Sequence, residues 1–138
     1  MKVKLSDVIE VLDFSNDEIE YYYNTKTEEI IMRIDGIFNG DDNLDLEDDM
    51  EENSEDYISF PSKYEINEYD IMRSFIYDLP EGKAQDSLFS AISGRGAFRK
   101  FKDKVYDVGI EKKWFEYRDA EYERIARKWC EENDIEII

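Results

Sequence analysis

The sequence predicts an α+β fold: an N-terminal helix and a small antiparallel β-sheet or hairpin in the first half, with a helical second half packed on it. Apolar residues alternate with polar ones along early segments, and they recur at helical spacing through the second half. Early strands followed by late helices are typical of α+β domains and not of parallel α/β sheets. With 138 residues, of which 41% are apolar, the chain can bury one core, so we expect a single domain over residues 1–138.

The first half is expected to hold one helix and three strands. Apolar side chains at helical spacing predict a short amphipathic helix over residues 4–13. The period then changes to strict alternation, and turn-forming residues at 24–27 separate two alternating segments. This pattern predicts a β-hairpin over about residues 18–35. A further short strand over residues 57–60 would end at Pro61, because proline has no N–H to donate to a ladder.

A strongly acidic stretch separates the hairpin from the third strand. Residues 41–56 carry ten acidic and no basic side chains, so we expect a flexible connector over about residues 39–56. Four positions match the ligand positions of a calcium-binding EF-hand loop: Asp41, Asn43, Asp45 and Glu52. Leu46 stands where the sharp turn of that loop needs glycine, so we favour a solvated acidic loop and expect no metal site.

The second half is expected to be mainly helical, because its apolar residues form stripes at helical spacing. Pro80 would stop the first of these helices. Residues 110–117 fit a helix and an extended chain equally well. The elements predicted are helices over residues 65–79, 83–92 and about 118–132, a helix that begins just after Gly96, and a closing strand at 135–138.

The composition excludes several kinds of catalytic and metal site. The chain has no histidine, which rules out Ser-His and Cys-His nucleophile pairs, a histidine base and histidine-containing zinc sites. The single cysteine, Cys130, excludes an intrachain disulfide, and we expect it to be a buried small hydrophobe. We therefore expect no cofactor and no catalytic residue. A carboxylate- or metal-dependent hydrolase is a disfavoured alternative, because 36 acidic side chains single out no catalytic pair.

The formal net charge of −18 is concentrated in the first half. Residues 1–60 carry 4 basic and 19 acidic side chains, whereas residues 61–138 carry 14 basic and 17 acidic ones. Such a field repels polyanions, so the net charge disfavours nucleic-acid binding. No apolar run is long enough to span a membrane, and acidic residues interrupt the N-terminal segment. We therefore expect no membrane association and a cytoplasmic location.

The most informative segment is basic and contains two glycines. From Arg95 to Lys104 the chain has five basic side chains and one acidic side chain. Glycines ahead of a helix let backbone N–H groups approach an anion, and the helix dipole favours the negative charge. The segment therefore predicts a contact surface for phosphate, nucleic acid or an acidic protein. Its candidate residues are Gly94, Arg95, Gly96, Arg99 and Lys102.

A structural explanation of this segment is favoured over a binding role. Gly94 would end one helix, and Gly96 would allow a tight corner. Phe98 and Phe101 would pack inward, and the basic face would pair with the acidic first half of the chain. Short glycine-containing turns are common, so a motif by itself supports a site only weakly.

The run from Gly94 to Asp103, GRGAFRKFKD, resembles the core motif of a bacterial family of uncharacterised proteins, whose pattern is GRGAFR(R/K)FKD-like. The resemblance extends in outline along the whole chain, through a tyrosine-bearing strand, a proline-ended strand and a late tryptophan, Trp114. Lys100 stands where a second arginine is common, which keeps the charge but loses a planar donor fork. The resemblance implies a complete small bacterial protein, and it implies no activity or cofactor.

These observations favour a small, cytoplasmic, non-enzymatic protein with a protein-interaction or regulatory role, and hence a protein partner. The alternative is recognition of an anion, a phosphate-containing ligand or nucleic acid through residues 94–104.

Overall fold

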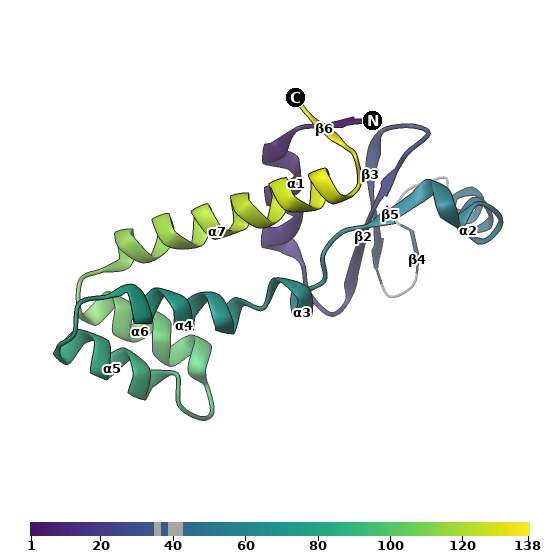
Figure 1. The fold of residues 1–138 in the computed structure, drawn as a ribbon. Coiled ribbons are helices and arrows are strands. Elements are labelled where there is room, and N and C mark those ends of the chain that lie inside the picture. The colour runs from purple at the N-terminus through teal and green to yellow at the C-terminus, as the bar shows by residue number, and fades with distance from the viewer. Residues whose placement is uncertain (35–36, 39–42) are drawn as a thin grey trace. The chain divides into compact units, whose positions relative to one another are not determined.

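The computed structural model covers residues 1–138 and describes all of them except residues 35–36 and 39–42 (Figure 1). The chain forms two compact units. The sheet unit comprises Met1–Ile66 and Tyr122–Ile138, and the helical unit comprises Asn67–Glu121. The single domain expected over the whole chain stays a prediction.

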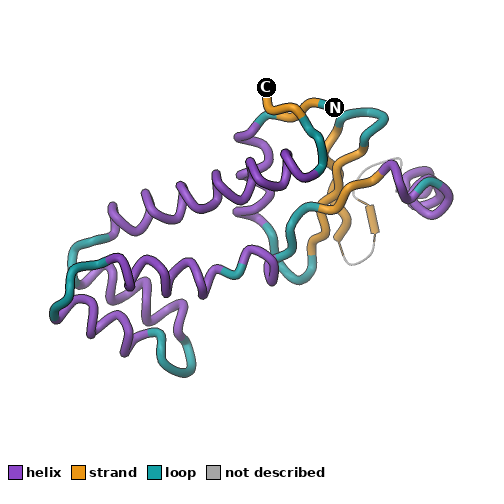
Figure 2. The backbone as a smooth tube through the Cα atoms, in the orientation of Figure 1, coloured by secondary structure: helices purple, strands orange, loops and turns teal. Residues whose placement is uncertain are grey.

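Within the described residues, the sheet unit is built on a four-stranded antiparallel sheet with strand order β4-β3-β2-β5 (Figure 2). In this sheet β2 is paired on both sides, so that Tyr22 lies opposite Ile31 of β3 and Ser59 of β5. The predicted hairpin and third strand are confirmed, and so is the α+β class. The strands are β2 (Ile19–Asn24), β3 (Glu29–Ile34), β4 (Ile37–Phe38) and β5 (Tyr57–Ser59).

The turn between β2 and β3 follows from the chemistry of Asn24. Its side-chain Oδ1 accepts hydrogen bonds from the backbone N–H of Lys26 at 3.0 Å and of Thr27 at 3.4 Å. The backbone N–H of Glu28 donates to the Asn24 carbonyl at 2.8 Å, and Glu28 adopts a left-handed φ of 60°. Asparagine favours tight turns because its side chain bonds the backbone that follows it.

A second, two-stranded sheet joins the two ends of the chain. β1 (Lys2–Val3) pairs in parallel with β6 (Glu136–Ile137). β1 leads into α1 (Leu5–Phe14), which buries Val8 and Leu12. The N-terminal helix and the closing strand are therefore confirmed, whereas β1 is too short to show a period in the sequence.

The core of the sheet unit includes Trp129, near the C-terminal end of α7 (Glu111–Glu132). Its ring stacks on Phe60 with centroids 4.2 Å apart and meets Tyr23 edge-on at 6.5 Å. The indole Nε1–H donates to the backbone carbonyl of Ser59 at 3.0 Å. These contacts pack the last part of the chain against the sheet.

The acidic stretch contains a helix, α2 (Asn43–Glu52), where the sequence predicts a connector. Arg33 of β3 donates from Nε and Nη2 to the two carboxylate oxygens of Glu47, each at 3.2 Å. Tyr57 donates its hydroxyl to Asp49 at 2.5 Å. These bonds offset part of the repulsion among the acidic groups, and their donors lie outside the stretch. The composition of the stretch therefore gives no sign of them.

Two predictions concern this acidic stretch. Residues 39–42, including Asp41 of the calcium pattern, lie outside the described residues. A helix over Asn43–Glu52 is not the loop that an EF-hand site needs. A short 3-10 helix, η1 (Ser54–Asp56), follows α2, and the flexibility of the connector stays a prediction.

The helical unit contains an aromatic cluster contributed by three helices. Phe101 lies 6.3 Å from Phe75 and 4.8 Å from Trp114, and Phe75 lies 5.4 Å from Trp114, all between ring centroids. Residues 110–117, which the sequence leaves open, are helical from Glu111 onwards. None of the helices in the described ranges is both long and apolar enough to cross a membrane. The helices are α4 (Glu68–Asp78), α5 (Lys83–Ala91), α6 (Ala97–Asp107) and the first part of α7.

The first helix predicted for the second half is divided at Asn67. The single turn α3 (Lys63–Ile66) begins with a capping box, in which the Glu65 N–H donates to Ser62 Oγ at 3.2 Å. Asn67 then adopts a left-handed φ of 52°, and its side chain accepts from the N–H of Asp70 at 3.3 Å. Asn67 thus acts as the N-cap of α4, because its amide oxygen satisfies a first-turn N–H.

Candidate functional site

The basic segment, residues 94–104, comprises the corner between α5 and α6 and most of α6. Gly94 has a φ of 105° and Gly96 has a φ of 70°. These left-handed conformations are strained for residues with a Cβ, so glycine is required for this corner. Gly96 is also the N-cap residue of α6. The end of α5 is held by Tyr69, whose hydroxyl donates to the Ile92 carbonyl at 3.1 Å.

The inner side of α6 packs into the helical unit. Ala97, Phe101 and Val105 recur every four residues and are buried. Phe98 does not join them, because its side chain is 43% exposed. The expectation that Phe98 packs inward is therefore wrong. Successive residues lie about 100° apart around a helix, so Phe98 falls at the edge of the buried stripe, in the first turn.

The outer side of α6 combines aromatic and basic side chains. Four exposed residues lie within an arc of about 100° around the helix, and we call them the α6 face: Phe98, Arg99, Lys102 and Tyr106. Tyr106 is 69% exposed. The structure thus brings together Arg99 and Lys102, two of the predicted candidates. Arg95 lies ahead of the helix, in the corner.

The five basic side chains of residues 94–104 are not ion-paired within the described part of the chain. None of the five makes an ion pair or side-chain hydrogen bond within the described part of the chain. Asp103 lies four residues after Arg99, and Asp107 lies three residues after Lys104. These spacings allow ion pairs on a helix, but neither pair forms among the described residues. By contrast, Arg127 of α7 pairs with the carboxylate four residues before it at 3.0 Å.

Lys100 and Lys104 lie on another side of α6, next to α5. They line an open hollow of about 430 Å³ together with small side chains of α5. Two carboxylates line the same hollow and balance the two ammonium charges, whereas the α6 face contains no carboxylate. The charged residues of the hollow are Lys100, Lys104, Asp103 and Asp107.

The division into units shows where the net charge resides. The sheet unit carries 8 basic and 25 acidic side chains, a net charge of −17. The helical unit carries 10 basic and 11 acidic side chains, a net charge of −1. The α6 face therefore belongs to a unit that is close to neutral.

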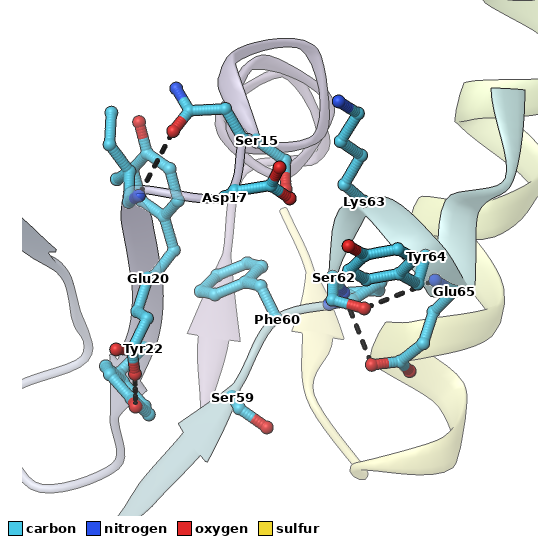
Figure 3. A pocket seen from close by; sticks show the side chains of 14 residues that line it. Ser15, Asp17, Glu20, Tyr22, Ser59, Phe60, Ser62, Lys63, Tyr64 and Glu65 are labelled. Atoms are coloured by element: carbon cyan, nitrogen blue, oxygen red, sulfur yellow. Dashed lines mark hydrogen bonds between the residues drawn. The ribbon is translucent and has the colours of Figure 1, made fainter.

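A larger hollow, the β2 pocket, lies in the sheet unit between β2 and the segment that joins β5 to α3 (Figure 3). Its volume is about 600 Å³. Sequence reasoning missed this pocket, because its walls come from residues 15–22 and 59–65 and only the pairing of β2 with β5 brings them together. No local period or motif marks it.

The polar groups of the β2 pocket are partly linked to one another. Tyr22 donates its hydroxyl to Glu20, as Figure 3 shows. Burial raises the pKa of Tyr22, and the neighbouring Glu20 carboxylate raises it further. The tyrosine therefore stays protonated at neutral pH. Arg33 Nη1 lies 4.0 Å from the same Glu20 carboxylate.

Two other candidate sites do not gather reactive groups. Cys130 is buried, and burial raises the pKa of its thiol. A thiol of raised pKa is a poor nucleophile at neutral pH. Among the residues that the structure describes, no three carboxylate or thiol groups are arranged to hold a metal ion.

A family model described as an uncharacterised protein family (UPF0158) matches residues 1–138. This match agrees with the predicted resemblance to a family of uncharacterised proteins. No curated protein and no solved structure shows significant similarity to the chain.

Proposed function

The chain belongs to the uncharacterised protein family UPF0158, and we propose that it acts as a non-enzymatic protein that binds an acidic segment of a partner protein through the α6 face. The family description names no activity, so the proposal is drawn from the geometry. The observation that carries it is the presence of two exposed rings and two unpaired cations on one side of α6. We place this activity in the cytoplasm, where a lone thiol such as that of Cys130 stays reduced.

The two cations favour an anionic ligand. The guanidinium of Arg99 has a planar donor fork that matches a carboxylate, and Lys102 adds a second charge one turn along. Neither side chain is paired with a described residue, so a ligand displaces no ion pair that the structure describes. Binding therefore costs translational and rotational freedom, desolvation and side-chain ordering, but no broken ion pair.

The two rings favour a protein ligand over a single small anion. Phe98 and Tyr106 are eight residues apart, which corresponds to about 12 Å along a helix. Phenylalanine, tyrosine and arginine are enriched in the centres of protein interfaces, where they contribute most of the binding energy. A segment of protein can cover both rings and place carboxylates on the cations between them.

Nucleic acid is the less favoured ligand. Its binding depends mainly on release of counterions by cations, and the chain carries a net charge of −18. An acidic protein segment gains part of its affinity from the rings, so it depends less on the electrostatic balance of the whole chain.

The proposal is tested with defined ligands in fluorescence anisotropy at low salt. One ligand is a labelled peptide of Glu, Asp and Leu, and the other is a labelled single-stranded oligonucleotide of equal charge. The variant Arg99→Glu/Lys102→Glu should raise the peptide Kd by about tenfold or more. The matched control Lys112→Glu/Lys113→Glu makes the same charge change on exposed residues of α7 and should leave the Kd within about threefold.

A second pair of variants tests the rings. Phe98→Ser/Tyr106→Ser should weaken peptide binding by about tenfold, whereas Phe115→Ser, at an exposed ring of α7, should not. Equal loss in both charge variants, or tighter binding of the oligonucleotide than of the peptide, would contradict the proposal.

A further inference from the structure

We propose that the β2 pocket binds an organic cation, namely an ammonium or guanidinium group carried on a short apolar body. The pocket lies in the sheet unit, so this inference is independent of the α6 face. Its volume of about 600 Å³ falls within the range of small-ligand pockets. The charges and the rings of the pocket both support the same kind of ligand.

The charged groups of the pocket are mainly carboxylates. Asp17, Glu20 and Glu65 line it, and Lys63 is the one cation among its described lining residues. Arg33 does not line the pocket, but its guanidinium lies 4.0 Å from Glu20, so Asp17 and Glu65 are the carboxylates that it leaves to a ligand. Asp17 makes no ion pair or side-chain hydrogen bond with a described residue, so its charge is available to a ligand. Figure 3 shows the Lys63 side chain extending away from Glu65. The net charge of −17 on the sheet unit adds to the attraction for a cation.

The backbone at the pocket is already paired. The Phe60 N–H donates to the Tyr21 carbonyl at 3.1 Å, and β5 pairing ends before Pro61. Beyond this end, Ile19 forms an isolated antiparallel bridge with Asn16, and its N–H lies 3.1 Å from Asn16 Oδ1. The acceptors that a ligand can use at this edge are therefore side-chain carboxylates.

These acceptors match the chemistry of ammonium and guanidinium groups. Such groups carry only donors, whereas a phosphate or carboxylate ligand would bring further acceptors and negative charge to the same wall. The carboxylate of Glu65 keeps one interaction of its own, because its Oε1 accepts from the Ser62 N–H at 3.3 Å. Its other oxygen can accept from a ligand.

The rings of the pocket suit the apolar body and the cation. Tyr21, Tyr22, Phe60 and Tyr64 line it. Figure 3 shows the Phe60 ring between the carboxylate-bearing side chains of the two walls. Aromatic faces attract ammonium and guanidinium groups through their quadrupole, and they bury an alkyl stem at the same time.

A metal ion fits the pocket less well than an organic cation. The described carboxylates do not form a group of three around a common point. Calcium and magnesium need several oxygen ligands at short distance, and aromatic rings supply none. An ammonium or guanidinium group needs only one carboxylate, and its apolar body can lie on the rings.

The experiment uses the full ¹⁵N-labelled chain and n-butylamine as the probe, with butan-1-ol as its neutral analogue. Butylamine should shift the amide resonances of residues 19–22 and 59–65, and butanol should shift them far less at equal concentration. Asp17→Asn/Glu20→Gln should weaken butylamine binding by about fivefold. The control Glu131→Gln/Glu136→Gln removes the same charge at exposed positions that do not line the pocket, and it should change the affinity by less than about twofold.

A further measurement distinguishes a free amine from a lysine side chain of a peptide as the source of the cation. Tighter binding of the capped tripeptide acetyl-Gly-Lys-Gly-amide than of butylamine would assign the natural ligand to a lysine side chain of a peptide. Equal or weaker binding of the tripeptide would assign it to a free amine. The proposal is overturned if butanol binds as well as butylamine, if Asp17→Asn/Glu20→Gln binds like the unmodified chain, or if calcium chloride competes for the same resonances with higher affinity.

Discussion

Replacing Trp129 by alanine should destabilise the sheet unit by about 3–5 kcal/mol. The side chain is only 6% exposed. Burial of about 150–250 Å² of aromatic surface, at roughly 25 cal/mol per Å², gives about 4–6 kcal/mol as an upper bound. The substitution also removes the stack on Phe60 and leaves the Ser59 carbonyl without the indole donor. Trp129→Phe keeps a ring but loses that hydrogen bond, so it should cost about 1–2 kcal/mol.

The assay is urea unfolding followed by far-ultraviolet circular dichroism, with the free energy of unfolding compared between variants. Phe115→Ala is the matched control, because Phe115 lies on the same helix and is 54% exposed. It should change the free energy of unfolding by about 0.5 kcal/mol or less. A change of less than about 1 kcal/mol for Trp129→Ala, or an equal loss for Trp129→Phe, would refute the assigned packing.

Three further predictions follow from the corner, the acidic helix and the buried thiol. Gly96→Ala should reduce the free energy of unfolding by about 1 kcal/mol, because φ is 70° at this position, and an unchanged urea midpoint would contradict it. Burial and the hydrogen bond to Asp49 raise the pKa of Tyr57 to about 12. The stability that this tyrosine contributes is therefore present below its ordinary pKa of about 10 and lost as the pH rises toward 12. In an ultraviolet titration, one tyrosine of the chain should ionise at a higher pH than the others, and this step should be missing in Tyr57→Phe. In Asp49→Asn, the pKa of Tyr57 should return part of the way to its ordinary value. Cys130, which is 1% exposed, should react with a thiol reagent at least about 100-fold more slowly in the folded chain than in urea, and equal rates would contradict its burial.

Most of the helices and the central hairpin could be predicted from the sequence, because their signals are local. The alternation along β2 and β3 and the turn at Asn24 lie within one stretch of chain. The division at Asn67 was missed, because an apolar stripe continues across a single left-handed residue without a change of period. The exposure of Phe98 was missed for a similar reason. Phe98 lies at the edge of an apolar stripe, where the packing of the neighbouring helices determines whether a side chain is buried.

The remaining features depend on contacts between distant residues. β1 and β6 are short strands at opposite ends of the chain, and neither has a period of its own. The helix α2 is supported by bonds from Arg33 and Tyr57, which a count of its acidic residues does not include. The β2 pocket likewise forms only when β5 pairs with β2. For the candidate site, the sequence indicated Arg99 and Lys102, and the structure added the rings of Phe98 and Tyr106 beside them.

The most direct test of the proposed function is to map where an acidic peptide binds the ¹⁵N-labelled full chain. The measurement follows amide resonances during titration with the unlabelled peptide of Glu, Asp and Leu. We predict that resonances of residues 98–106 shift together with a single Kd and that the shifts disappear in Arg99→Glu/Lys102→Glu. Shifts that are scattered over the chain, or that persist unchanged in this variant, would contradict binding at the α6 face.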